Sequence, residues 1–135
     1  MSYTYTQCNH VDPIVAVVMP VCNASATLEA TIQSVLAQSF DQFELIIVDD
    51  GSTDDSLARA LALAASDTRV RLISRTNGGV SSARNLGASL GKAPLLAFID
   101  ADDLWDRCKL AKHVTLHSEN PQLAASYARI AFISH

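Results

Sequence analysis

The sequence predicts an α/β domain in which helices cover a parallel β-sheet. Apolar, β-branched runs alternate with segments of helical period along the chain, which is the pattern of this fold class. The runs are almost continuously apolar, as is typical of strands buried on both faces. The length of 135 residues and the hydrophobic content of 49% are sufficient for one domain with a substantial core. We expect a polar extension over residues 1–12 and a single domain over residues 13–135.

Five apolar runs are predicted as strands because they are short, β-branched and bounded by polar or turn-forming residues. They occupy residues 14–19, 44–48, 70–73, 95–99 and 124–133. The intervening segments predict helices over residues 28–36, 52–61, 81–90 and 104–118. The second helix is predicted to begin at the capping-box pattern Ser52-Thr53-Asp54-Asp55, and Gly91 and Pro94 are expected to end the third.

Charge and cysteine content exclude several classes of protein. A formal charge of −4 argues against a nucleic-acid grip based on clustered lysine and arginine. Three cysteines, Cys8, Cys22 and Cys108, have no paired spacing and indicate a reducing compartment. The first twelve residues lack the pattern of a signal peptide, and no apolar run approaches the length of a membrane helix. We therefore expect a cytoplasmic protein, peripheral to the inner membrane surface if a longer form carries an anchor.

Acidic residues follow two of the predicted strands. Asp100-Ala101-Asp102-Asp103 comes directly after the run at 95–99, and Asp49-Asp50 follows the run at 45–48. Open α/β sheets bind ligands beyond the carboxyl ends of their strands. Carboxylate clusters at that edge suit hard cations such as Mg²⁺ or Mn²⁺. These acids therefore predict one rim at which a divalent metal and a phosphate group meet.

Further motifs accompany the acids in a fixed order. They are Val17-Val18-Met19-Pro20-Val21-Cys22-Asn23, Val48-Asp49-Asp50-Gly51-Ser52-Thr53-Asp54, Asn77-Gly78-Gly79, Ala83-Arg84-Asn85-Leu86-Gly87 and the D-x-D-D motif at residues 100–103. In this order and spacing, from about residue 14 to 110, the chain resembles the N-terminal, nucleotide-sugar-binding part of a family 2 inverting glycosyltransferase. The resemblance implies a GT-A fold (nucleotide-diphospho-sugar transferase, Rossmann-like), a mostly parallel sheet flanked by helices and here apparently truncated.

Asp100 and Asp102 are candidates for the diphosphate end of the donor. Alternate residues of an extended segment point the same way, so both carboxylates can reach one site. The resemblance implies that Asp100 lies near the ribose and that Asp102 holds the divalent metal. The alternative is that Asp102 or Asp103 caps the helix predicted from Leu104.

Asp50 is implied by the resemblance to accept a hydrogen bond from uracil, and Asp49 has the alternative of a structural role. A carboxylate is acceptor-only and so suits an imide N–H. In a further alternative both acids cap the helix predicted at Ser52. The loop at Asn77 can admit a ligand close to the backbone, and Arg84 can then reach the base or the phosphates, or else form a surface ion pair.

The complete candidate set has two parts. For the nucleotide sugar it comprises Pro20, Cys22, Asn23, Asp49, Asp50, Asn77, Arg84, Asp100 and Ala101, and for the metal it comprises Asp102. Cys22 stands where the family often has tyrosine, which removes a stacking partner for the base. Trp105 is expected in the core. His113 and His117 share the spacing of zinc ligands but lack the accompanying glutamate, so we do not assign them a metal.

The resemblance implies an enzyme that transfers a sugar from a nucleotide-diphosphate donor, with UDP-linked donors favoured, to an unknown acceptor with inversion. The acceptor can be a glycan, a lipid carrier or a protein. The acids after Asp103 are Asp106 and Glu119, and neither matches a catalytic base of the family, so this chain alone is expected to be inactive. The alternatives are a non-catalytic nucleotide-binding module and a phosphoacceptor receiver-like domain. A dinucleotide-binding fold lacks support because no G-x-G-x-x-G turn follows the first strand. A truncated sheet also favours self-association.

Overall fold

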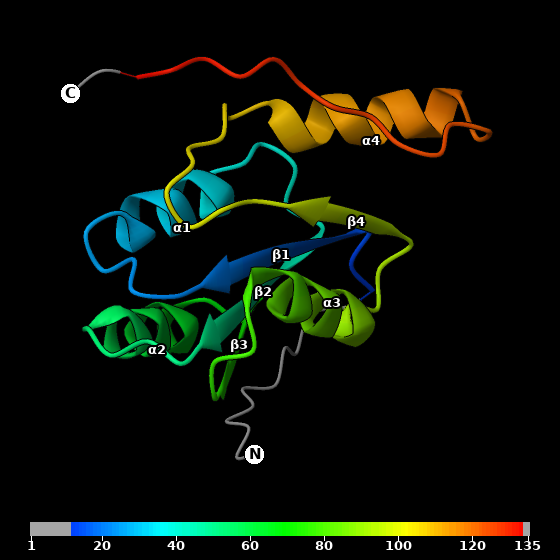
Figure 1. Ribbon diagram of the computed structural model, residues 1–135. Coiled ribbons are helices and arrows are strands. Elements are labelled where there is room, and N and C mark those ends of the chain that lie inside the picture. The colour runs from blue at the N-terminus through cyan, green and yellow to red at the C-terminus, as the bar shows by residue number, and fades with distance from the viewer. Residues whose placement is uncertain (1–11, 134–135) are drawn as a thin grey trace.

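The computed structural model describes residues 12–133, which form a four-stranded sheet with helices on both faces (Figure 1). Most of the predicted polar extension, together with Cys8, lies outside the described residues. The elements in chain order are β1 (Val15–Val21), α1 (Leu28–Leu36), β2 (Phe43–Asp50), α2 (Ser56–Ser66), β3 (Val70–Arg75), α3 (Val80–Leu90), β4 (Leu95–Phe98) and α4 (Lys109–Glu119).

The sheet has the order β3-β2-β1-β4, and every neighbouring pair is parallel. Strands β1 and β2 are buried along their whole length, which explains the apolar runs at residues 15–19 and 45–48. Because all strands are parallel, their carboxyl ends lie at one edge of the sheet. The loops that follow β1, β2 and β4 therefore emerge close together.

Two apolar clusters fill the space between the sheet and its helices. The larger joins alternate residues of β1 and β2 to apolar side chains of α1, α2 and α4, and Trp105 packs against it as expected. The smaller joins the opposite face of the sheet to Ala83 of α3. Helix α3 lies close to the strands because Gly87 has no side chain, and a Cβ there would lie 2.4 Å from Cγ1 of Val18.

The predicted strand over residues 124–133 is wrong. This segment is not part of the sheet, and the side chains of Tyr127, Ile130 and Phe132 are 96%, 85% and 99% exposed. In Figure 1 the segment returns along α4, drawn in orange to red. Its apolar sequence resembles that of a strand, but within residues 12–133 it has no neighbouring strand with which to pair.

Two predicted helices begin later than expected. Helix α2 begins at Ser56 because the capping-box residues bond elsewhere: Oγ of Ser52 accepts the Asn23 N–H at 3.0 Å. Helix α4 begins at Lys109. The backbone just before it bonds to side chains instead: the Trp105 N–H donates to Ser34 on α1, and the Asp106 carbonyl accepts from Gln38, which follows α1. Helix α3, in contrast, ends at Leu90 before Gly91 as predicted. No helix within residues 12–133 is long and apolar enough to cross a membrane.

Candidate functional site

A cleft of about 700 Å³ lies at the carboxyl edge of the sheet, beyond the ends of β1, β2 and β4. The structure brings eight predicted residues to its walls: Pro20, Cys22, Asn23, Asp50, Arg84, Asp100, Ala101 and Asp102. The prediction omitted Val21, Ala24, Ser25, Ala26, Thr27 and Val80, which also line the cleft. Asp49 and Asn77 do not line it. The sequence therefore located the cleft, but not all of its wall.

The three carboxylates of the acidic loop after β4 differ in their contacts and in their pKa. Arg84 of α3 forms an ion pair with Asp100, and both side chains are partly exposed. The carboxylate of Asp102 is exposed and has neither a hydrogen bond nor an ion pair with residues 12–133. Burial raises the pKa of Asp103, and the charges of Asp102 and Asp100 add to the effect. Of the three acids, Asp102 is the one that lines the cleft and whose carboxylate has no partner among residues 12–133.

The helix-capping alternative for Asp102 and Asp103 is wrong. Helix α4 begins at Lys109, and Cys108 occupies its N-cap position. The N–H of Asp103 instead donates to the carbonyl of Asp100 at 3.1 Å and closes a tight turn. The acids thus belong to a turn that faces the cleft.

Two threonine hydroxyls hold this turn from the side of α1. Oγ1 of Thr27 and Oγ1 of Thr31 each donate to the carbonyl oxygen of Ala101 at 2.9 Å. Thr31 is buried, with 1% of its surface exposed. Neither threonine belongs to a motif that is recognisable in the sequence, although their i, i+4 spacing places them on one face of the helix.

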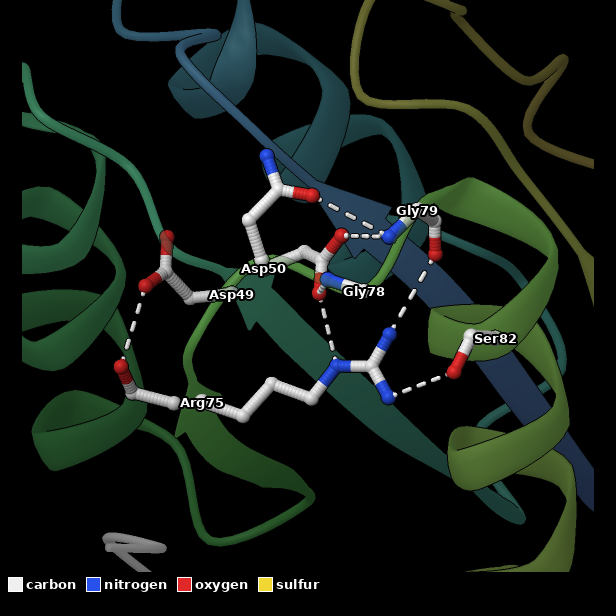
Figure 2. Close-up of polar contacts among 8 residues, drawn as sticks. Asp49, Asp50, Arg75, Gly78, Gly79 and Ser82 are labelled. Atoms are coloured by element: carbon white, nitrogen blue, oxygen red, sulfur yellow. Dashed lines mark hydrogen bonds and ion pairs between the residues drawn. The ribbon is translucent and has the colours of Figure 1, made fainter. Parts of the chain in front are cut away.

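Asp50 anchors the loop between β3 and α3, as Figure 2 shows. Its Oδ1 accepts from Nε of Arg75 at 2.7 Å and from the Gly78 N–H at 2.9 Å, and its Oδ2 accepts from the Gly79 N–H at 2.8 Å. Arg75 in turn reaches Oγ of Ser82 at 2.9 Å. Sequence reasoning missed Arg75, because its partner lies 25 residues earlier in the chain.

The charge state of Asp50 follows from these contacts. Burial alone would raise the pKa of this carboxyl, but the hydrogen bonds from Gly78, Arg75 and Gly79 outweigh burial and lower the pKa below its usual value. A carboxylate offers about four lone-pair positions, and three are used here. By this count, one lone-pair position on Oδ2 has no donor among residues 12–133.

Asp49 and Asn77 shape the surroundings of the cleft. Asp49 is 1% exposed, and its Oδ2 accepts a hydrogen bond from Oγ of Ser74 at 3.1 Å. Asn77 turns its own loop, with Oδ1 accepting the Gly79 N–H at 3.2 Å. The alternative in which Asp49 and Asp50 cap a helix at Ser52 is wrong, since α2 begins at Ser56.

The loop after β1 is joined to the loop after β2 through Asn23. This residue has a positive φ of 50°, a conformation that asparagine tolerates better than most residues. Its Oδ1 accepts the backbone N–H groups of Thr53 at 2.8 Å and Asp54 at 3.3 Å. Hydrogen bonds from Ser56 and Ser25 hold the pKa of Asp54 well below its usual range. The wall of the cleft that carries Cys22 is therefore tied to α2.

The donor set suits a metal that is shared with a ligand. Within residues 12–133 no three histidine, cysteine or acidic side chains are placed to hold a metal ion by themselves. Mg²⁺ typically binds through one or two carboxylates plus substrate phosphates and water. A free carboxylate on Asp102 fits that mode. His113 and His117 lie outside the cleft, and both contact Oγ of Ser126, at 2.6 Å and 3.0 Å.

Comparison with known proteins identifies relatives of this chain. Residues 16–135 match the family described as Glycosyl transferase family 2. A glycosyltransferase of Haemophilus influenzae is 36% identical over 121 residues, which is 89% of this chain and 48% of that protein. The Escherichia coli protein named UDP-Glc:alpha-D-GlcNAc-diphosphoundecaprenol beta-1,3-glucosyltransferase WfgD is 34% identical over 110 residues, 81% of this chain and 43% of that protein. The chain thus spans about half the length, or less, of these relatives.

Solved structures share the fold. TarS of S. aureus in complex with UDP-GlcNAc superposes with a TM-score of 0.74 at 24% identity, over 79% of this chain and 32% of that one. The mannosyltransferase PcManGT of Pyrobaculum calidifontis, in complex with GDP-Man and Mn²⁺, gives a TM-score of 0.74 at 23% identity, over 84% of this chain and 34% of that one. These likenesses confirm the predicted fold class.

Proposed function

The chain belongs to glycosyltransferase family 2 and has the GT-A fold, and we propose that its cleft binds a nucleotide-diphosphate sugar, with UDP-linked sugars as the preferred donors. The observation that carries the proposal is the free carboxylate of Asp102 beside the Arg84–Asp100 ion pair at the rim of the cleft. Family membership also sets aside the receiver-like alternative. The UDP-linked donor in the name of the WfgD relative supports the choice of base.

Asp102 would hold a Mg²⁺ or Mn²⁺ ion together with the donor diphosphate. Such an ion neutralises charge on the leaving diphosphate when it is bound. Without it, a carboxylate and a phosphate oxygen about 4 Å apart repel by roughly 4 kcal/mol at an effective dielectric near 20. Arg84 supplies a second positive charge, since its guanidinium already lies at the acidic turn.

Asp50 is proposed to recognise the base of the donor. The remaining lone pair on Oδ2 can accept the imide N–H of uracil. The same carboxylate fixes the backbone at Gly78 and Gly79, so its role in recognition is combined with a structural one.

Transfer with inversion needs a base that deprotonates the acceptor hydroxyl. We assign that role to no residue of this chain. We propose that the 135-residue chain binds the donor with a divalent metal and does not transfer the sugar at a rate above slow hydrolysis. A longer form of the protein would supply the base and the site for the acceptor, whether a glycan, a lipid carrier or a protein.

Calorimetry with UDP, with and without Mn²⁺, tests the proposal. We expect Mn²⁺ to strengthen UDP binding, and the variant Asp102→Ala to lose most of that gain. Asp55→Ala is a matched control, because Asp55 is also exposed and acidic but does not line the cleft. Equal Mn²⁺ dependence in the wild type and Asp102→Ala would contradict the metal assignment. Sustained transfer from a radiolabelled UDP-sugar by the 135-residue chain would contradict the division between binding and catalysis.

A further inference from the structure

One polar face of α1 and the turn after it hold the segment that follows β4. Thr27, Thr31, Ser34 and Gln38 are spaced at i, i+4, i+7 and i+11, which places them on one side of a helix. Each of them bonds to the backbone of the segment from Ala101 to Leu110. We call these four residues the α1 polar stripe.

The contacts made by the stripe follow the segment in order. At the near end, the two threonine hydroxyls meet at the Ala101 carbonyl. Further along, the Trp105 N–H donates to Oγ of Ser34 at 3.1 Å. At the far end, Gln38 donates to the carbonyl of Asp106 at 2.7 Å and accepts the Leu110 N–H at 3.0 Å. Side chains rather than a neighbouring strand thus fix this backbone.

The Ala101 carbonyl has a special place in this series. It lies between the two acids of the D-x-D motif, and its peptide group is shared with Asp102. A carbonyl oxygen has two lone pairs, so two hydroxyl donors satisfy it completely. Two donors also fix the orientation of the peptide plane more tightly than one. The direction in which the chain enters Asp102 is therefore set from α1.

We propose that Thr27 and Thr31 are positioning residues for the metal and the diphosphate of the donor, because they hold the turn in the conformation that presents Asp102 to the cleft. The inference rests on the proposed function. Thr27 lines the cleft and can contact a ligand directly, whereas Thr31 is buried and does not line it. An effect of Thr31 on binding is therefore indirect and passes through the groups that its hydroxyl contacts, the Ala101 carbonyl at 2.9 Å and the Thr27 carbonyl at 3.3 Å.

The test compares variants of Thr31 by calorimetry with UDP, with and without Mn²⁺. Thr31→Val keeps the shape of the side chain but removes the hydroxyl. We expect it to weaken Mn²⁺-dependent UDP binding about tenfold, the scale of one lost buried hydrogen bond, and to leave metal-free UDP binding unchanged. Thr31→Ser, which retains the hydroxyl, should restore the affinity. Thr115→Val, on the exposed face of α4, is the matched control.

Urea unfolding of each variant separates positioning from general stability. If Thr31→Val does not fold, Thr31→Ala carries the same test, because it removes the hydroxyl without placing a methyl group against the Ala101 carbonyl. Suppose that the wild-type chain shows Mn²⁺-dependent UDP binding and that a folded Thr31→Val variant shows the same dependence. This outcome would overturn the positioning role and leave the proposed function standing. A wild-type chain without any Mn²⁺ dependence would overturn both.

Discussion

Asp50→Asn separates the structural from the recognition role of this carboxylate. Asparagine has one acceptor oxygen, so it can keep two of the three hydrogen bonds at most, and its amide group would face the remaining N–H donor. The change also removes the charge partner of Arg75, whose side chain is 8% exposed beside a carboxylate that is 4% exposed. Removal of one partner from a buried pair typically costs about 3–5 kcal/mol, and we expect a loss in that range.

Urea unfolding, followed by the fluorescence of the single tryptophan, Trp105, measures this loss. With a typical slope of about 2 kcal/mol per M, the midpoint should fall by about 2 M. Asp102→Asn is the control, because its carboxylate is exposed and unpaired within residues 12–133, and its midpoint should stay close to that of the wild type. A midpoint for Asp50→Asn within about 0.5 M of the wild type would refute the reasoning. A comparison of UDP with ADP in this variant then shows whether base recognition is lost beyond the loop.

Three further outcomes follow from other contacts. Gly87→Ala should destabilise the chain by about 1–3 kcal/mol through its clash with Val18, more than the roughly 1 kcal/mol gained in helix propensity, and an unchanged urea midpoint would contradict this. Arg71→Met should lower the free energy of unfolding by about 3–5 kcal/mol, because it leaves the carboxylate of Glu44 buried without its ion-pair partner. Adding Glu44→Leu should recover most of this loss. If the losses of the two single variants simply add in the double variant, the pair is not coupled and the prediction fails. Burial lowers the pKa of His113 from 6.5, so an NMR titration of its ring should have a midpoint below 6.5. Because the unfolded chain binds this proton more readily, the free energy of unfolding should fall as the pH drops below 6.5. A midpoint above 6.5 would exclude burial as the dominant effect.

Four of the five strands could be predicted because apolar residues predominate in each, although only β1 and β2 are buried throughout and Leu96 and Phe98 of β4 are half exposed. The structure extends three of them past the predicted ends, to Val21, Asp50 and Arg75. These extra residues pair across the sheet, as with Asp50 opposite Arg75, and pairing of this kind has no signal in the local sequence. The segment at 124–133 shows the converse, since an apolar pattern does not make a strand without a neighbour.

Cleft-lining residues could be predicted where they lie in one sequence motif. Contacts between loops that are distant in the sequence could not be predicted. Asp100 and Asp102 could be located because a single turn carries both. The bond between Thr31 and Ala101 joins residues 70 positions apart, so no local pattern identifies it. The late start of α2 has the same origin. Ser52 has the composition of a cap, but its hydroxyl bonds to the loop after β1 instead.

The strand order has a consequence for how this site can change. From β1 the chain steps through β2 to β3, and it then crosses back over the sheet to place β4 on the other side of β1. The segments after β1 and β4 nevertheless lead to helices on the same face of the sheet, α1 and α4, and residues of both loops line the cleft at its carboxyl edge. Cys22 and Val80 line the cleft but belong to neither apolar cluster, so substitutions there can change its lining while the strands beneath keep their register.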